Sequence, residues 1–562
     1  MRNLFIICVL SIIGSFNLNS QNYNEFTALA MDLYKSKEFK ESSKNWDKAF
    51  KIQKGLSSDY YNAACTNALA GNSEKAFDYL EKSIENGWED INWLKKDSDF
   101  ESLKKLKQWD EFIDKIPQLK QGYINSLQRV EKLESEFFNE ERNIKIHLPP
   151  NYNKNKKYPI IYTLDGHELF EITSNYRKFL SKYNVIPNSI VVSIFHTNRN
   201  YETTPNYGRY KNIPTNKFLE GSEKLKKHLF KEVIPFINAN YSTSGFNVLI
   251  GHSNTATLAS QFISDLNNPF DGIISITPDL LKTQIEDIKL TLQNKRNKNI
   301  YYFVSSGTKD NKYRFKTGKL LDSIFKRNTN PQIIAEEKSY NAGHVDLIVK
   351  SLNDALLFVF SDYRNYDDFE NKVIENKLSV SHYLNEKNNL TVKNYGIPFN
   401  FMRDDFQYLL DVTVSKKNSE VLEQLFEATN KNNFFPKEEF YSQKAQIYEK
   451  MGLYNEALKN WKLQIEQGFN KNIFYYERPF NLIYKKLNRP EEAITFLENS
   501  IEIYPKGKLI FSFNIAKICA ENNILNKKGL ENIDYCIKFF KENNRFTLSE
   551  AMKIKKVLEQ RK

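Results

Sequence analysis

Short blocks rich in Val, Ile, Tyr and Phe run through the middle of the chain, from about residue 142 to residue 363. Nearly continuous apolar blocks are typical of strands that are buried on both faces of a sheet. Stretches with the apolar period of a helix separate several blocks, as at residues 218–241 and 255–266. This alternation predicts a doubly wound α/β domain with a parallel sheet. The predicted strands are Tyr158–Gly166, Ser189–His196, Phe246–Gly251, Gly272–Pro278 and Ile300–Gly307.

Both flanking regions show a different pattern, in which small and apolar residues recur at 34 residues in the N-terminal flank and 36 in the C-terminal flank. This pattern resembles the tetratricopeptide repeat, in which each helical hairpin buries its apolar face against a neighbour. Ordinary amphipathic helices are the alternative. The resemblance implies peptide or protein partners. The recurring residues are Ala30, Ser42, Trp46 and Ala49, then Ala64, Ala76, Leu80 and Ser83, and later Tyr448, Ala457 and Trp461, then Tyr484, Ala493 and Leu497.

The chain of 562 residues is long enough for several domains. The patterns divide it into a signal peptide over residues 1–20, an N-terminal tetratricopeptide-like helical domain over 21–122, an α/β domain over 123–365 and a C-terminal helical, tetratricopeptide-like domain over 366–562.

The N-terminus has the features of a signal peptide. Arg2 precedes the apolar run Leu4–Ile13, and a polar stretch follows it. The run is shorter than the roughly 20 residues of a membrane-spanning helix. We therefore predict cleavage near Ser20 and export, with a periplasmic or secreted mature chain; an uncleaved N-terminal anchor is the alternative. No later segment has the length and hydropathy of a transmembrane helix.

The composition gives predictions about nucleic-acid binding and about the cysteines. The net charge is +12, but 27% of the residues are charged and both signs are abundant. No basic stripe of the kind that binds nucleic acid stands out, so we expect no nucleic-acid partner. After the apolar N-terminal run the chain keeps Cys65, Cys519 and Cys536, each in a helical apolar pattern. We interpret these cysteines as core residues.

Gly251-His252-Ser253-Asn254-Thr255 joins the third predicted strand to a helix. Hydrolases with a serine nucleophile read G-x-S-x-G at such a turn, because residues two before and two after the serine face each other. Gly251 fits this rule, whereas the branched Cβ of Thr255 is expected to crowd the turn. We therefore predict that Ser253 is the nucleophile and that Thr255→Gly raises ester turnover, or at least does not lower it.

A serine nucleophile needs a base and an orienting acid, in the chain order Ser, acid, His. Two histidines follow Ser253, and His344 lies in a small-residue loop ahead of a helix, whereas His382 lies in the helical tail. His344 is therefore the predicted base. Asp310 after the fifth predicted strand is the favoured acid, and Asp279 after the fourth is the competitor.

Two backbone N–H groups must face the developing oxyanion. One should be that of Asn254, and the other should come from Gly166 or His167 in the loop after the first predicted strand. Residues 199–210 are expected to cover the site, where Arg199 and Tyr201 could hold an anionic or aromatic substrate. No metal and no cofactor is implied.

Four segments together resemble the putative-esterase family of α/β-hydrolases, which includes enterochelin-type, esterase D-like and feruloyl esterases. They are RNIKIHLPPNY, YPIIYTLDGHELF, GHSNTA and SYNAGHVDLIVKSLNDALLFVF. The resemblance covers Arg142 to about Tyr363 and implies a serine esterase acting on a small-molecule ester through Ser253, Asp310 and His344. The family usually reads G-H-S-x-G-G, where this chain has Thr255-Ala256. A hydrolase-like binding module on an interaction scaffold, or a peptidase, are the alternatives.

Overall fold

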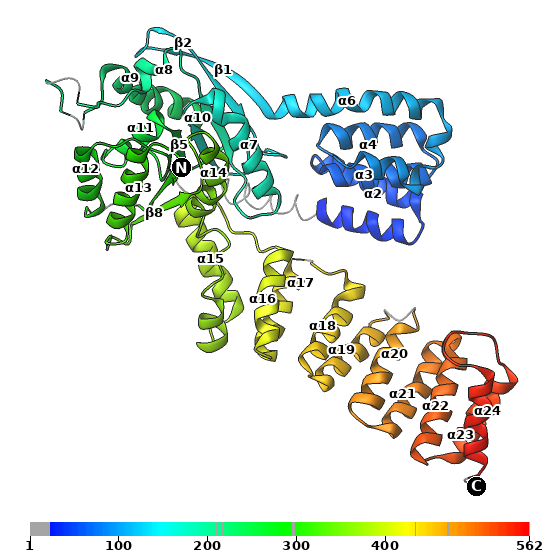
Figure 1. Cartoon of the computed structure of the whole chain (residues 1–562). Helices are drawn as coiled ribbons and strands as arrows, with labels where there is room; N and C mark the ends of the chain where they lie inside the picture. The colour runs from blue at the N-terminus through cyan, green and yellow to red at the C-terminus, as the bar shows by residue number, and fades with distance from the viewer. Residues whose placement is uncertain are drawn as a thin grey trace, which may run out of the picture. The chain divides into compact units, whose positions relative to one another are not determined.

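The computed structural model describes residues 23–208, 212–214, 217–294, 298–432, 434–468 and 472–560. The predicted signal peptide lies outside the described residues. The chain divides into two compact units (Figure 1). The first unit runs to Tyr363 and also takes in Thr391–Ile397; the second comprises Arg364–Leu390 and the chain from Pro398 onward. Among the described helices, none has both the length and the hydropathy to cross a membrane.

An eight-stranded sheet forms the centre of the first unit, with the strand order β1-β2-β4-β3-β5-β6-β7-β8. The strands β3 to β8 run parallel to one another, and β1 and β2 add an antiparallel edge. The strands are β1 Gln128–Ser135, β2 Glu140–His147, β3 Tyr158–Thr163, β4 Ile190–Ile194, β5 Thr243–His252, β6 Gly272–Ile276, β7 Ile300–Gly307 and β8 Ile333–Tyr340.

The predicted α/β fold is confirmed, and all five apolar blocks form strands. All residues of β3, β4, β6 and β7 are buried, as expected for strands covered on both faces. The hairpin of β1 and β2 was not predicted as strands. Its exposed and buried residues alternate in part, so it lacks the continuous apolar signal.

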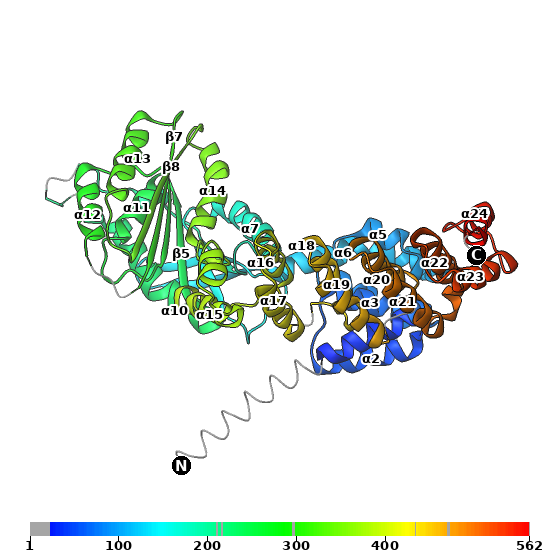
Figure 2. The same cartoon turned by 90° about the horizontal axis from the view of Figure 1, so that it is seen from below.

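Helices cover both faces of the sheet (Figure 2). One core cluster joins Leu258, Ile285 and Leu321 to one face, and a second joins Leu169 and Leu347 to the other. The sheet is therefore packed between helices on both of its faces. The helices are α7 Gly166–Lys182, α8 Arg199–Thr203, α9 Glu220–His228, the π-helical turn Leu229–Val233, α10 Ile234–Asn240, α11 Asn254–Phe262, α12 Lys282–Leu292, α13 Lys312–Phe325 and α14 Asp346–Val359.

The N-terminal flank is helical, as predicted. The residues that recur at 34-residue spacing are all buried, among them Ala64, Ala76 and Leu80, so the small side chains do mark the helix contacts. α6 contains the predicted boundary at residues 122–123 and continues directly into β1. Residues 23–35 are helical. The helices that follow are α2 Phe39–Ile52, α3 Ser57–Leu69, α4 Ser73–Glu85, α5 Ile91–Lys96 and α6 Lys107–Leu127, with 3₁₀ turns at Ser98–Phe100 and Leu103–Lys105.

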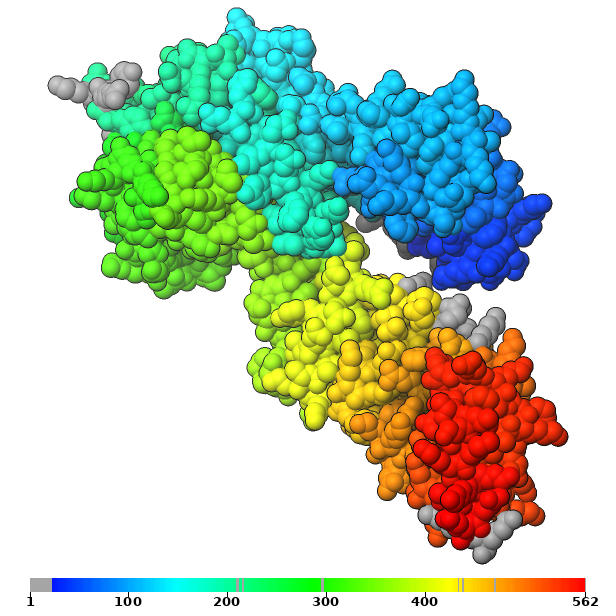
Figure 3. Space-filling view, turned by 45° about the vertical axis from the view of Figure 1, so that its right-hand side comes forward, coloured from blue at the N-terminus to red at the C-terminus, as the bar shows by residue number. Residues whose placement is uncertain are grey.

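The second unit is a run of helices that pack in chain order. Its surface is coloured from yellow-green to red in Figure 3. The predicted contact residues Ala457, Trp461, Ala493 and Leu497 are all buried. The helices are α15 Val380–Tyr395, whose last turn belongs to the first unit, α16 Arg403–Ser415, α17 Ser419–Lys431, α18 Lys437–Met451, α19 Tyr454–Glu466, α20 Phe474–Asn481, α21 Pro490–Ile503, α22 Lys508–Asn522, α23 Asn526–Lys538 and α24 Leu548–Glu559, with π turns at Glu370–Glu375 and Leu482–Lys486 and a 3₁₀ turn at Pro505–Gly507.

Candidate active site

Ser253 stands on a sharp turn between β5 and α11. Its backbone has φ 63° and ψ −119°, a region that a residue with a side chain rarely adopts and that costs about 1–3 kcal/mol. The amide of Ser253 donates a hydrogen bond of 3.0 Å to the carbonyl of Ile276 at the end of β6. The neighbouring strand thus anchors the strained residue. This is the backbone geometry expected of an exposed nucleophile between a strand and a helix.

Thr255 does not crowd this turn as its branched Cβ led us to expect. A Cβ at Gly251 would lie 2.4 Å from the Thr255 carbonyl oxygen, so glycine is required at position 251. The Thr255 side chain itself is fully buried. Its hydroxyl accepts from the His252 amide at 2.8 Å and lies 2.7 Å from a carboxylate oxygen of Asp165. The threonine therefore bonds to the turn instead of pushing it apart.

His344 and Asp310 meet at the same edge of the sheet. Nδ1 of His344 lies 2.9 Å from Oδ2 of Asp310. Because an ionised carboxylate can only accept, Nδ1 carries the proton and Nε2 is left free to act as a base. The His344 side chain is 38% exposed, whereas the Asp310 side chain is 5% exposed. A buried acid thus orients an accessible imidazole.

The carboxylate of Asp310 is held by several donors. Thr277 donates to Oδ2 at 2.5 Å, and the amide of Asn311 donates to Oδ1 at 2.6 Å. Burial alone would raise the pKa of Asp310, but hydrogen bonds from Thr277 and His344 outweigh it and hold the pKa below its usual value. Asp310 therefore stays ionised beside His344.

Asp279, the competing acid, has a different partner. Its carboxylate lies 3.4 Å from a guanidinium nitrogen of Arg314. Among the described residues, Asp310 supplies the carboxylate that bonds the His344 ring. The geometry therefore favours Asp310 over Asp279 as the orienting acid.

The loops that carry Asp310 and His344 are fastened to each other. A Cβ at Gly307 would lie 2.5 Å from the carbonyl oxygen of Ala342, so the glycine allows the two loops to touch. The amide of Lys309 donates to that same carbonyl at 2.9 Å. These contacts fix the register of the acid and the base.

His252 connects the nucleophile turn to the base. Its Nε2 lies 2.9 Å from the carbonyl oxygen of His344, and the two rings are 4.7 Å apart. Burial lowers the pKa of His252 to about 4, so the ring is neutral at pH 7 and Nε2 donates to that carbonyl. The residue next to Ser253 therefore contacts His344 directly. Among the described residues, the Ser253 hydroxyl itself makes no hydrogen bond, and catalytic hydrogen bonds often tighten only with substrate bound.

The predicted oxyanion donors lie at two helix N-termini. Asn254 opens α11, and Gly166 and His167 open α7. The first N–H groups of a helix have no acceptor within the helix, and in the described residues these three N–H groups donate to no other group. We expected Gly166 and His167 in a loop, and that was wrong, because the helix begins at Gly166. Asp165 before it takes the left-handed conformation at φ 60°.

The segment expected to cover the site begins with the short helix α8. Arg199 is paired with Asp165 by hydrogen bonds of 2.5 and 3.0 Å, so its charge is already compensated. Tyr201 is 42% exposed, and its ring lies 5.8 Å from the ammonium group of Lys224. Neither observation places these two side chains on a substrate. Tyr207, another tyrosine of this segment, donates to the Asn254 side chain at 2.9 Å.

Residues 135–344 match the family model described as putative esterase, and residues 482–506 match one described as tetratricopeptide repeat. The chain carries an esterase-family domain. The match spans the sheet from β2 to β8 and reaches His344, and it supports an esterase-type hydrolase.

Individual relatives share this part of the chain. An uncharacterized protein, YjcH of Bacillus subtilis, is 29% identical over an alignment of 209 residues that covers 35% of this chain and 80% of that protein. An IroE-like serine hydrolase from Shewanella oneidensis is 20% identical and covers 53% of this chain and 97% of its own, with a TM-score of 0.43. An uncharacterised protein from Capnocytophaga ochracea is 18% identical, covers 63% and 99%, and has a TM-score of 0.47.

A buried ionic cluster of Arg142, Glu202 and His196 lies next to Asp165 in the esterase domain. Arg142 of β2 donates to both carboxylate oxygens of Glu202, at 2.9 and 2.5 Å. His196 lies 2.8 Å from Glu202 through Nδ1 and accepts the Asp165 amide at 3.4 Å through Nε2. Burial would raise the pKa of Glu202, but its bonds with His196 and Arg142 hold that pKa at about 2. The carboxylate is therefore charged at neutral pH.

A cavity of the first unit lies away from Ser253. It has a volume of about 400 Å³ and is lined by Trp88, Tyr123, His147 and Lys178, among others. Burial, followed by the charge of Arg177, lowers the pKa of His147 to about 3. No described residue of the predicted triad lines this cavity, so we do not place the esterase chemistry there.

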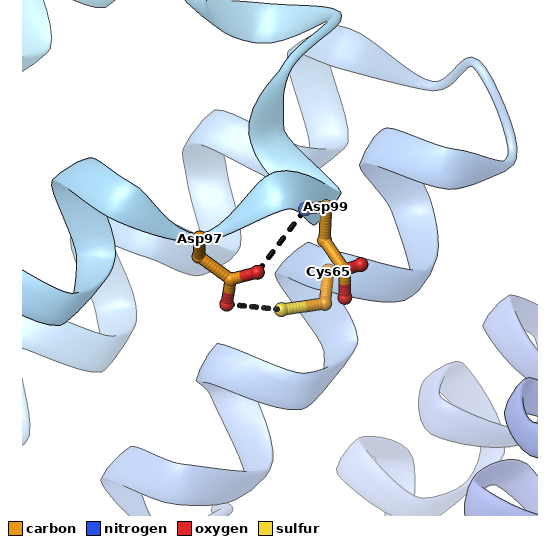
Figure 4. A group of neighbouring side chains, drawn as sticks. All are labelled: Cys65, Asp97 and Asp99. Atoms are coloured by element: carbon orange, nitrogen blue, oxygen red, sulfur yellow. Dashed lines mark hydrogen bonds between the residues drawn. The ribbon is translucent and has the colours of Figure 1, made fainter.

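Cys65, Asp97 and Asp99 come close together in the N-terminal helices (Figure 4). The carboxylate oxygens that could bind a metal ion already accept hydrogen bonds. Asp97 accepts from the Tyr61 hydroxyl at 2.8 Å and from the Asp99 amide at 3.1 Å, and Asp99 accepts from Tyr34. Burial raises the pKa of the Cys65 thiol far above its usual value. A metal ion would have to displace these bonds and deprotonate a buried thiol, so the group fits a hydrogen-bonded helix junction.

Proposed function

We propose that the esterase domain hydrolyses a carboxylic ester through an acyl-enzyme intermediate. Ser253 is the nucleophile, His344 the base and Asp310 the orienting acid. The observation that carries the proposal is the strained turn at Ser253 on the same sheet edge as the His344–Asp310 pair, with His252 bonded to the His344 backbone.

In the first half of the reaction, Oγ of Ser253 attacks the ester carbonyl carbon while Nε2 of His344 takes its proton. The carbonyl oxygen becomes an oxyanion that accepts hydrogen bonds from the amide of Asn254 and from Gly166 or His167. Asp310 stabilises the imidazolium that forms. The C–O bond to the alcohol then breaks, and His344 gives its proton to the departing oxygen, which leaves an acyl group on Ser253.

In the second half, water replaces the alcohol. His344 takes a proton from the water as its oxygen attacks the acyl carbon, and the same N–H groups hold the oxyanion. The bond between the acyl carbon and Oγ then breaks, Ser253 recovers its proton from His344, and the acid leaves. No metal or cofactor enters any of these steps.

The test is covalent labelling with a fluorophosphonate, which reacts with activated serines. The wild-type protein should be labelled, and mass spectrometry should place the adduct on the peptide that contains Ser253. Ser253→Ala should abolish labelling, whereas Ser264→Ala, a serine just beyond α11, should keep it. Labelling that persists in Ser253→Ala would refute the assignment. An unlabelled wild-type protein would favour the alternative of a non-catalytic binding module.

We further infer export and a protein partner for the helical flanks. Export is supported by the N-terminal sequence pattern, which lies outside the described residues. The partner is supported by the tetratricopeptide match at residues 482–506. Fractionation of cells expressing the tagged full chain tests the first inference. A pull-down that is lost when residues 366–562 are deleted tests the second.

A further inference from the structure

Thr255 occupies the position where the serine-hydrolase motif has glycine, and it uses its hydroxyl fully. The hydroxyl accepts the His252 amide at 2.8 Å. It has a single proton to donate, with the Asp165 carboxylate at 2.7 Å and the His252 carbonyl at 2.8 Å as the possible acceptors. A charged acceptor makes the stronger hydrogen bond, so we assign the proton to the bond with Asp165. A glycine could make none of these contacts.

Asp165 is held from three directions. Its side chain accepts from Thr255 and from two guanidinium nitrogens of Arg199, and its amide donates to His196. The residue is 4% exposed and has a left-handed backbone at φ 60°. Such a residue is fixed in orientation, and it determines where the next residue, Gly166, begins α7.

We propose that Thr255 and Asp165 are positioning residues that hold the two halves of the oxyanion hole at a fixed separation. Thr255 directly follows Asn254, which supplies one N–H donor. Asp165 directly precedes Gly166, which with His167 supplies the other. The 2.7 Å hydrogen bond therefore joins the two donor segments one residue away from each donor. The inference rests on the proposed function, since it assigns a role in that reaction.

The separation of the donors matters because an oxyanion is stabilised only when both N–H groups lie about 2.7–3.1 Å from it. A displacement of about 1 Å in a catalytic site can lower the rate about 100-fold. Loss of the Thr255 hydroxyl should therefore lower kcat by about 10- to 100-fold. KM should change by less than about twofold, because an oxyanion forms only after the substrate has bound.

The decisive variants keep the shape of the side chain. Thr255→Val removes the hydroxyl and keeps the branched Cβ, whereas Thr255→Ser keeps the hydroxyl. The valine variant should lose kcat, and the serine variant should recover most of it. Thr173→Val on α7 is the matched control, because Thr173 is equally buried and its hydroxyl has no partner among the described residues. That control should turn over p-nitrophenyl acetate like the wild type.

A second variant tests the other end of the bond. Asp165→Gly removes the carboxylate and tolerates the left-handed backbone. If the two residues act together, Asp165→Gly with Thr255→Val should lose little more kcat than the worse single variant. If the valine variant fails to fold, Asp165→Gly and Thr255→Ser still test the proposal. The glycine variant should lose kcat, and the serine variant should keep most of it.

Three outcomes would overturn the proposal while fluorophosphonate labelling of Ser253 stays intact. They are a wild-type kcat in Thr255→Val, equal losses in the valine and serine variants, or fully additive losses in the double variant. Thr255→Gly should also lose kcat, which reverses the expectation drawn from the motif alone. Absent labelling of the wild type would instead reject the proposed function itself.

Discussion

The esterase domain and the helices α18 to α24 bury polar side chains in different ways. The esterase domain buries charged groups, including Arg142, Asp165 and Glu202, close to the predicted site. From α18 to α24, the buried polar side chains of the described residues are uncharged, and the packing rests on residues such as Trp461 and Leu497.

This difference separates two uses of burial. A buried charge costs free energy unless it is paired. A domain that keeps several buried charges near one sheet edge must therefore hold each of them against a partner, and these pairs fix the geometry there. Helices that pack through apolar and small residues gain stability from area removed from water. Substitutions of the buried charges should therefore lower activity or stability, depending on their distance from Ser253, whereas substitutions in α18 to α24 should lower stability alone.

The largest effect should come from Asp310→Asn. The amide keeps the shape of the carboxylate but cannot stabilise the imidazolium of His344, and in the serine-protease template the equivalent loss costs about 10⁴ in turnover. We expect kcat to fall by at least about 100-fold with KM little changed. Asp279→Asn is the matched control and should do far less, because that carboxylate faces Arg314. An inactive Asp279→Asn beside an active Asp310→Asn would reverse the assignment of the acid.

The next effect should come from Glu202→Gln, measured by urea unfolding. The substitution takes the buried carboxylate of Glu202 from Arg142 and leaves it Glu140 at 2.6 Å. The loss should therefore lie at the lower end of the about 3–5 kcal/mol that breaking a buried pair costs. Glu101→Gln, at an exposed partner of Lys104, should cost far less, because water screens that ion pair. Equal losses in both variants would contradict this account of the cluster.

The same carboxylate predicts how stability depends on pH. The pKa of Glu202 is lowered from 4.5 to about 2. Its contribution is therefore fully present above pH 4.5 and is lost as the pH falls towards 2. The wild type should lose stability across this window more steeply than Glu202→Gln, and parallel curves would contradict the prediction.

The smallest effect on chemistry should come from Leu497→Ala in α21. Leu497 is 1% exposed, and removing a buried leucine costs about 2–5 kcal/mol. We expect a lower unfolding midpoint and an unchanged kcat for p-nitrophenyl acetate. A loss of kcat at a temperature where the variant is fully folded would show that the helices act on the esterase reaction.

The sequence predicted the parts of the fold that depend on local apolar patterns. β3 to β7 were found because their residues are apolar on both faces, and the repeat contacts were found because small residues recur with a fixed spacing. The hairpin of β1 and β2 was missed because charged residues such as Lys132 and Arg142 interrupt its pattern. Arg142 is buried beside Glu140 and Glu202, and no local pattern reveals Glu202, which lies 60 residues further along the chain.

The candidate site shows the same limit. Ser253, Asp310 and His344 could be placed because each follows a strand in a set order. The contacts of Thr255 could not be predicted, because its hydroxyl bonds to Asp165, which lies 90 residues earlier. The start of α7 was misjudged, since Asp165-Gly166 reads as a turn until the carboxylate and its partners are seen together.

The buried cysteines have a practical consequence. Cys65 lies in the N-terminal helices, Cys519 and Cys536 lie in the C-terminal ones, and all three are free. Burial raises the pKa of Cys519 to about 11 and that of Cys536 to about 12, and Cys65 is raised further still. Thiolates are the reactive form, so these positions resist alkylation while their surroundings stay folded. The protein thus has native reporters in both helical regions, and the order in which they become modified in denaturant gives the order in which those regions open.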